Sequence, residues 1–360
     1  MNVFCTVVTR SHLPHARALA DSLVTAGNTE PLHILVVDTG TGSLPADEPL
    51  LRFHGFDAVQ AGVPPLMRYY YDAFELCNAL KPHLIAYLFQ QGAAQVIYLD
   101  SDLLVTGTFA SVWADFGTAS LQLTPHLLAP PELSDRHVNE IEIVDMGFLN
   151  GGFSAWRASP ASARMLEWLQ SRLCIYGFCD RRHGMFADQK LMPLLLQYYP
   201  DDVRVLRHPG LNVAFWNARE RTVRESAPGR WSVNEVPVIF FHLSGYRLEH
   251  AGMPCSYLPV EVNQALLTDS PWLIGVMAAY DAGLRRHAAG QHPSSYPFSS
   301  FDGVRLTAEY RALLFKTGSL NRRTLAFQSI RFRGYLRLFK RQILRLASLF
   351  SNRAPASRAT

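Results

Sequence analysis

The sequence predicts an α/β protein in which an open sheet carries helices on its two faces. Short apolar runs rich in Val, Ile, Leu and Phe recur along the chain, as expected of strands that are buried on both faces. Helical segments alternate with these runs in the N-terminal part of the chain, and this order of elements is typical of such sheets. With 360 residues and 48% hydrophobic content, the chain is long enough to bury a large core.

The first three elements are a strand, a helix and a second strand. The run VFCTVVT (3–9) is almost continuously apolar and predicts the first strand. Ser11 and Pro14 open a helix, and one apolar face of it is made by Ala16, Leu19, Ala20, Leu23 and Val24. The run LHILVVDTG (32–40) predicts a second buried strand that ends at Asp38.

Two helical segments and a third strand follow. The segments are MRYYYDAFELCNAL (67–80) and KPHLIAYLFQQG (81–92), and Pro82 lies in the first turn of the second one, where proline is tolerated. The run QVIYL (95–99) then predicts a buried strand. Its carboxyl end is immediately followed by two aspartates that a single serine separates.

The remaining elements are expected, in order, as a strand at 146–157, helices at 159–173 and 187–199, a strand at 236–247 and an irregular cap at 251–309. The strand at 146–157 has Gly151 and Gly152 in its middle. Paired glycines inside a strand mark a bulge or a place where another group approaches the backbone closely. The strand at 236–247 ends in a polar cluster that contains His242 and Gly245.

Asp100 and Asp102 are the candidate metal ligands. Open α/β sheets bind their ligands beyond the carboxyl ends of the strands, where these two side chains are expected. Mg²⁺ and Mn²⁺ favour carboxylate oxygens, and such an ion can neutralise a departing diphosphate. The competing interpretation is a turn with two solvated acids. Neither a P-loop nor a G-x-G-x-x-G loop follows any of the predicted strands.

Five segments in this order resemble the nucleotide-sugar-dependent glycosyltransferases of the GT-A fold, most of all glycosyltransferase family 8. They are NALKPHLIAYLFQQG (78–92), VIYLDSDLLV (96–105), FLNGGFSAWR (148–157), ADQKL (187–191) and FFHLSG (240–245). The resemblance covers residues 1–250 and implies a GT-A catalytic domain with an open mixed sheet. It also implies transfer of a hexose from a UDP-linked donor to a cell-surface glycan or lipid-linked saccharide, with retention of configuration. Lipopolysaccharide or capsule biosynthesis is the process that this activity fits.

The resemblance assigns roles to individual residues. It implies that Asp100 and Asp102 hold Mn²⁺ or Mg²⁺, with Asp102 the surer ligand, and that His242 completes the metal site. Asp188 and Gln189 match the pair beside the reactive carbon of the sugar. Donor or nucleotide contacts are implied for Thr6, Val8, Thr9, Asp38, Lys81, Ser101, Asn150, Gly151, Gly152, Gly245 and Arg247.

Several of these roles have structural alternatives. Asp188 and Gln189 can instead cap the following helix, and Lys81 can be a solvated helix start. The family often has a lysine a few residues after the histidine, whereas this chain has Arg247 in that region, so phosphate contact by Arg247 departs from the family pattern. An inverting enzyme would need a carboxylate base, for which Asp188 or Glu220 is available.

The region HPGLNVAFWNARE (208–220) precedes the histidine strand. In it, Trp216 can stack on an acceptor sugar, although a buried tryptophan is the commoner case. We therefore leave Trp216 out of the predicted catalytic residues.

The cysteines and the N-terminus fit a cytoplasmic protein. The chain has five cysteines, an odd number that favours reduced thiols over a disulfide framework. Cys174 and Cys179 have the spacing of half a zinc site, but no second pair follows them. The N-terminus predicts a strand rather than a secretion signal, and no apolar run reaches the roughly 18 residues of a membrane-spanning helix.

Residues 310–360 differ in charge from the rest of the chain. They contain twelve basic and no acidic residues, whereas residues 1–309 have 22 basic and 30 acidic ones. The tail predicts a basic amphipathic helix that lies on an anionic membrane surface, at the inner face of the cell membrane. Docking on the acidic body of the protein is the alternative. No nucleic-acid-binding module accompanies the charge, so we expect no nucleic acid partner.

Two other functions share this fold. A sugar-1-phosphate nucleotidyltransferase would need a glycine-rich basic loop after the first strand, and TRSHLPHARAL (9–19) lacks it. A catalytically inactive module that binds sugar or acts as a scaffold at the membrane would not need Asp100, Asp102 and His242.

Overall fold

The computed structural model describes residues 1–39, 44–132, 140–288 and 295–318. Most of the expected basic tail, residues 319–360, therefore lies outside the described residues. Within the described ranges, no helix is both long and apolar enough to cross a membrane. Cys5, Cys77, Cys174, Cys179 and Cys255 are free thiols.

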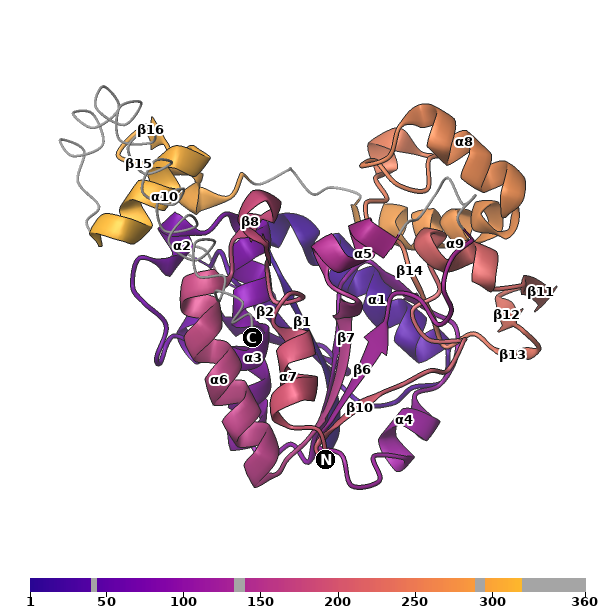
Figure 1. Ribbon diagram of the computed structural model, residues 1–360, viewed down its shortest axis with the longest axis horizontal. Helices are drawn as coiled ribbons and strands as arrows, with labels where there is room; N and C mark the ends of the chain where they lie inside the picture. The colour runs from indigo at the N-terminus through magenta and orange to yellow at the C-terminus, as the bar shows by residue number, and fades with distance from the viewer. Residues whose placement is uncertain (40–43, 133–139, 289–294, 319–360) are drawn as a thin grey trace, which may run out of the picture.

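A seven-stranded mixed sheet forms the centre of the molecule, as predicted (Figure 1). The strand order is β10 (Val203–Val205), β6 (Leu121–Pro125), β7 (Leu149–Arg157), β4 (Gln95–Leu99), β1 (Asn2–Val8), β2 (Leu32–Val36) and β3 (Leu51–Gly55). Only β7 runs antiparallel to its neighbours in this sheet. The carboxyl ends of the parallel strands therefore share one edge of the sheet, which is the upper edge in Figure 1.

Helices cover both faces of this sheet. One core lies between the sheet and α3 (Ala73–Gln90), α6 (Pro160–Tyr176) and α7 (Met192–Tyr198). The other lies between the sheet and α1 (Leu13–Thr25) with α4 (Ala110–Ala114). Along β1, Val3, Cys5 and Val7 face the first core and Phe4 and Val8 face the second. Because both faces are covered, the strand has an almost continuous apolar sequence.

The two helical segments expected at 67–80 and 81–92 are arranged differently. Most of their residues form one helix, α3, which passes through Pro82 without a break, and α2 (Met67–Tyr70) is a separate short helix. Asp72 and Glu75 form a capping box that fixes the start of α3 at Ala73. The cost of an interior proline, about 3 kcal/mol, is offset because α3 is packed against the sheet and α6.

Three other expectations need correction. Val24 does not belong to the buried face of α1, because its side chain is 53% exposed near the helix end. Strands β3, β6 and β10 were not expected; β3 extends the sheet beyond β2, and β6 and β10 extend it beyond β7. Helix α7 begins at Met192 instead of residue 187, because residues 187–191 form turns.

The histidine strand leaves the main sheet. β14 (Phe240–His242) pairs antiparallel with β5 (Leu103–Val105), so that His242 lies opposite Leu103. Around this pair the chain forms short elements, namely α5 (Glu140–Met146), β8 (Cys179–Asp180), β9 (Met185–Phe186), β11 (Val223–Ala227), β12 (Arg230–Val233), β13 (Val236–Pro237) and the 3-10 helix η4 (Phe215–Glu220). The β5–β14 pair therefore brings residues 240–242 next to residues 103–105, which follow the two aspartates.

The segment expected as an irregular cap at 251–309 contains two well-formed helices. α8 (Val260–Asp269) and α9 (Trp272–Ala288) follow the histidine strand, and α9 packs on α1, where Asp21 pairs with Arg286. Residues 295–318 form β15 (Ser300–Phe301), β16 (Val304–Arg305) and α10 (Ala308–Thr317).

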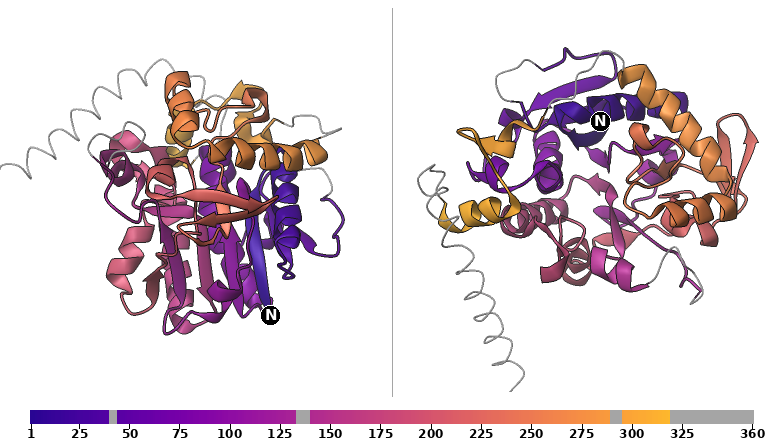
Figure 2. Two further views of the ribbon diagram at one scale, coloured as in Figure 1. Left: turned by 90° about the vertical axis from the view of Figure 1, so that its right-hand side faces the viewer. Right: turned by 90° about the horizontal axis from the view of Figure 1, so that it is seen from above.

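The two parts of the C-terminal segment lie on different sides of the molecule. Figure 2 shows α8 and α9 on one side of the strand ends and α10 on the other. The guanidinium of Arg311 on α10 donates to the carbonyls of Tyr69 and Phe298. The expected boundary at residue 310 therefore falls inside a helix that is anchored to the body.

Candidate active site

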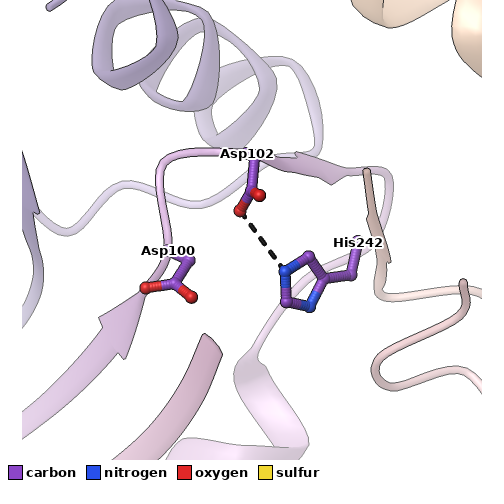
Figure 3. Close-up of side chains that lie close together, drawn as sticks. All are labelled: Asp100, Asp102 and His242. Carbon is purple, nitrogen blue, oxygen red and sulfur yellow. Dashed lines mark ion pairs between the residues drawn. The ribbon is translucent and has the colours of Figure 1, made fainter. Parts of the chain in front are cut away.

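Asp100, Asp102 and His242 converge at the carboxyl end of β4 (Figure 3). Asp100 follows the last residue of β4, and its amide donates to the carbonyl of Gly152 over 2.9 Å. Asp102 precedes β5, and its carbonyl accepts from the amide of Leu243 over 2.9 Å. The pairing of β5 with β14 therefore brings His242 to the two aspartates. One ligand atom from each of the three residues lies within 4.8 Å of the others.

The charges of this cluster fit a divalent cation. His242 is buried, whereas both aspartates are half-buried. Burial disfavours the charged form of Asp102, but His242 outweighs that effect and lowers the pKa of Asp102, whose Oδ1 lies 3.3 Å from Nε2. The same Oδ1 atom is buried without a hydrogen-bond donor. Two carboxylates and one imidazole are a donor set that accepts Mn²⁺ or Mg²⁺.

The glycine pair of β7 lies directly beside these ligands. The register of β7 with β6 shifts between Leu123 and Thr124, so the expected bulge is confirmed. A Cβ at Gly152 would lie 2.5 Å from Cε1 of His242 and 3.0 Å from Oδ2 of Asp100. A Cβ at Gly151 would lie 3.2 Å from Oδ1 of Asp188. Only glycine at position 152 therefore leaves His242 and Asp100 in place.

Lys81 is buried inside α3 and connects the metal cluster to Asp188. Its Nζ lies 3.3 Å from Oδ1 of Asp100 and 3.2 Å from Oδ2 of Asp188, and it donates to the carbonyl of Gly151 over 2.9 Å. Burial alone would lower the pKa of Lys81, but the two carboxylates outweigh it and the pKa is raised. Burial raises the pKa of Asp188, and Lys81 opposes this shift. Lys81 is therefore a buried cation and not a solvated helix start.

Gln189 and Asn150 support the glycine backbone. Gln189 accepts from the amide of Gly151 over 2.9 Å and donates to the carbonyl of Met146 over 3.0 Å. Asn150 accepts from the amide of Gly152 over 2.9 Å. The N-cap of α7 is Leu191 and has no side-chain hydrogen bond, so the capping interpretation of Asp188 and Gln189 does not hold.

The residues expected around the nucleotide divide into two groups. Thr6 and Val8 lie inside the protein at 0% and 2% exposure, because β1 is a central strand with both faces covered. The side chains of Lys81 and Asp188 are buried as well, so the nucleotide contacts of Thr6 and Val8 stay predictions. Thr9 and Asp38 lie at the ends of β1 and β2, where Asp38 accepts from the amide of Arg10 over 2.8 Å. Burial raises the pKa of Asp38.

The loops on the other side of the metal cluster carry Ser101, Gly245 and Arg247. The carbonyl of Ser101 accepts from the hydroxyl of Tyr280 on α9 over 3.5 Å. Gly245 has φ +80°, and a Cβ there would lie 2.7 Å from Sγ of Cys255. Burial raises the pKa of Tyr257, the charge of Asp102 adds to this shift, and the charge of Arg247 opposes it. Arg247 therefore lies in the electrostatic range of the cluster.

Sequence reasoning missed His12 and His15. Their rings lie 5.0 Å apart, and burial lowers the pKa of His15 to about 4, although Asp102 acts in the opposite direction. Both follow the first strand, and the run HLPH is the one signal that could have marked them. The described residues also place Trp216 edge-on to His242, with ring centroids 5.1 Å apart.

Glu220 has a structural role. Its carboxylate accepts from the amides of Leu128 and Ala129 over 2.9 Å each and lies 3.3 Å from Nε of Arg221. These contacts hold the chain that precedes α5, so Glu220 is not free to act as a base.

No family model matches the chain. It is similar to two proteins of Bacillus subtilis (strain 168) that are described as uncharacterized. YfnF is 24% identical over 252 residues, which are 69% of this chain and 82% of that protein. YfnD is 26% identical over 253 residues, which are 68% of this chain and 78% of that protein.

Three solved structures are also similar to this chain. The galactosyltransferase LgtC, in complex with donor and acceptor sugar analogs, is 17% identical, with 75% of this chain and 96% of that one covered and a TM-score of 0.47. Mouse xyloside xylosyltransferase 1 is 15% identical, with 67% of this chain and 97% of that one covered and a TM-score of 0.38. The glycosyltransferase GlyE of Streptococcus pneumoniae TIGR4 is 13% identical, with 82% of this chain and 66% of that one covered and a TM-score of 0.41. At this level of similarity, the side chains of the site have to carry the functional assignment.

Proposed function

We propose that this protein is a metal-dependent glycosyltransferase that moves a hexose from a UDP-linked donor to a glycan or lipid-linked acceptor. One observation carries the proposal: Asp100, Asp102 and His242 offer three ligand atoms within 4.8 Å of one another at the carboxyl edge of the sheet. Lys81 links this cluster to the buried carboxylate of Asp188. Three candidate metal ligands beside the buried ammonium group of Lys81 suit a diphosphate with a sugar attached.

The three cluster residues would hold Mn²⁺ or Mg²⁺, which when bound supplies positive charge to the leaving diphosphate. Gly151 and Gly152 leave room for the side chains of Asp188, Asp100 and His242 beside the strand. Lys81 keeps Asp188 in place, so that its carboxylate can accept from a sugar hydroxyl. In the transfer, the bond from the anomeric carbon to the diphosphate breaks and a bond to the acceptor oxygen forms.

Retention of configuration is part of the proposal. An inverting reaction needs a carboxylate that takes the acceptor proton. Asp188 is held in a buried ion pair with Lys81, and Glu220 is bonded to main-chain amides, so neither carboxylate is free to turn toward an acceptor hydroxyl. A phosphate oxygen of the leaving group is then the acceptor of that proton.

The alternative as a sugar-1-phosphate nucleotidyltransferase is less well supported. After β1 the chain forms the 3-10 helix η1 (Arg10–His12) and no glycine-rich loop. Pyrophosphate release from a nucleoside triphosphate and a sugar 1-phosphate would favour that alternative.

The test combines ligand binding with turnover. We expect UDP with Mn²⁺ to raise the melting temperature and Asp102→Asn to abolish the metal-dependent part of this shift. We also expect Mn²⁺-dependent hydrolysis of a UDP-sugar, with the α-anomer as the first product detected by NMR. Absence of both metal binding and hydrolysis would leave an inactive sugar-binding or scaffold protein as the remaining function.

Cytoplasmic location at the inner membrane surface, in lipopolysaccharide or capsule biosynthesis, is the second part of this proposal. It is motivated by the charge of residues 310–360, with twelve basic and no acidic side chains. Flotation of the full chain with vesicles that contain an anionic lipid tests it. Replacing Arg337, Lys340 and Arg341 by Glu should release the protein from these vesicles, because each basic residue contributes about 1 kcal/mol.

A further inference from the structure

Asn212 is a buried residue in direct contact with the imidazole of His242. Its side chain is fully buried, and its φ of +55° is a left-handed conformation that asparagine tolerates better than most residues. Asn217 supports this conformation, because its Nδ2 donates to the carbonyl of Asn212 over 2.8 Å. The main chain at Asn212 is therefore held in this conformation by the side chain of Asn217.

The orientation of the Asn212 amide is fixed as well. Its Nδ2 donates to the carbonyl of Pro125 over 3.2 Å, and a carbonyl can only accept. The atom that faces His242 is consequently Oδ1, which lies 3.1 Å from Nδ1. An amide oxygen cannot donate, so a hydrogen bond here requires the proton on Nδ1 of the ring.

This proton position determines what the opposite nitrogen can do. A neutral imidazole with its proton on Nδ1 has a lone pair on Nε2. Nε2 is the atom that lies 3.3 Å from Oδ1 of Asp102. If the proton were on Nε2 instead, it would point at Oδ1 of Asp102, and Nε2 would have no lone pair left for a cation.

We propose that Asn212 is a positioning residue that selects the Nδ1-protonated tautomer of His242 and so makes Nε2 available as a metal ligand. The inference rests on the metal site of the proposed function. The imidazole lies between Asn212, whose Oδ1 is 3.1 Å from Nδ1, and the edge-on ring of Trp216, whose centroid is 5.1 Å away. Partners of this kind affect metal affinity by about 10- to 100-fold.

The experiment uses the full chain without substrate. Mn²⁺ alone is titrated and followed by the electron paramagnetic resonance signal of the free ion. Asn212→Gly removes the acceptor but permits the positive φ, and we expect it to weaken Mn²⁺ binding by about 10- to 100-fold. Asn212→Asp keeps an oxygen acceptor for Nδ1 and should retain Mn²⁺ affinity within about 3-fold, which is well inside the span expected for losing such a partner.

Asn28 provides the matched control. It is also buried, donates to the carbonyls of Leu23 and Gly107, and accepts from the amide of Phe109. Asn28→Gly should therefore lower stability while leaving Mn²⁺ affinity unchanged. An equal loss of affinity in this variant would mean that Asn212 acts only through general stability.

The tautomer is read directly in the wild type by NMR of ¹⁵N-histidine-labelled protein, with His242 assigned by its absence in His242→Gln. We expect the proton on Nδ1. A proton on Nε2 in the metal-free protein, or equal Mn²⁺ affinity in wild type and Asn212→Gly, would overturn the inference alone. Absence of Mn²⁺ binding by the wild type would instead overturn the metal site of the proposed function.

Discussion

Gly152→Ala gives a sharp test of the metal cluster because its effect follows from three distances. The added Cβ would lie 2.5 Å from Cε1 of His242, 2.9 Å from Oδ1 of Asn150 and 3.0 Å from Oδ2 of Asp100. His242 cannot move away easily, since Asn212 and Trp216 contact its ring. We expect an overpacking cost of about 1–3 kcal/mol in the free energy of unfolding.

The effect on metal binding is measured separately. Wild-type protein at Mn²⁺ equal to about 100 times the Kd should gain about 2.7 kcal/mol of stability. If displacement of the two ligands weakens binding about tenfold, that gain falls to about 1.4 kcal/mol. Urea unfolding with and without Mn²⁺ measures both numbers.

Gly151→Ala is the control for Gly152→Ala. It lies on the same strand, and its Cβ would approach only the carboxylate oxygens of Asp188, at 3.2 and 3.3 Å. We expect it to preserve most of the Mn²⁺ gain. An unchanged Mn²⁺ gain in Gly152→Ala would refute the geometry of the cluster.

Four further predictions concern other parts of the molecule. Lys81→Met leaves Asp100 and Asp188 without their buried cation and should cost about 3–5 kcal/mol in urea unfolding, whereas adding Asp188→Leu should restore part of it. Arg247→Ala should weaken UDP binding by about tenfold in calorimetry without changing the affinity for Mn²⁺ alone, as expected for loss of one charge-assisted hydrogen bond. Burial lowers the pKa of His33 from 6.5 to about 4, so its contribution to stability is present above pH 6.5 and is lost as the pH falls through 4. Denaturation of His33→Gln should accordingly depend less on pH in that window; an equal dependence would contradict the assignment. Finally, Val24→Lys should change stability by less than about 0.5 kcal/mol because Val24 is exposed, while Leu23→Ala should cost about 2–5 kcal/mol.

The sequence predicted β1, β2, β4 and β7 of the main sheet because these strands are buried on both faces. Residues such as Val3, Phe4 and Val96 can only be apolar there, so the pattern is strong. Helix α3 was divided wrongly, since local rules count Pro82 as a helix boundary while packing against the sheet and α6 compensates for it. Long-range packing of this kind has no local signature.

The candidate site was predicted unevenly for a similar reason. Asp100, Asp102 and His242 stand at strand ends, where a polar residue after an apolar run is conspicuous. The contacts of Asn212 and the buried environment of Lys81 depend on which segments meet in space, and neither has a sequence pattern of its own. The full burial of Thr6 and Val8 has no sequence pattern either, because position along the central strand does not distinguish a core side chain from a surface one.

The pairing of β5 with β14 has a consequence for how the protein matures. His242 is synthesised long after Asp102. A nascent chain therefore has the carboxylates of Asp100 and Asp102 without the imidazole of His242 until β14 pairs with β5. An incomplete chain would then lack one of the three ligands of the proposed metal site. Binding of a metal ion by all three side chains would then indicate that β14 has paired with β5.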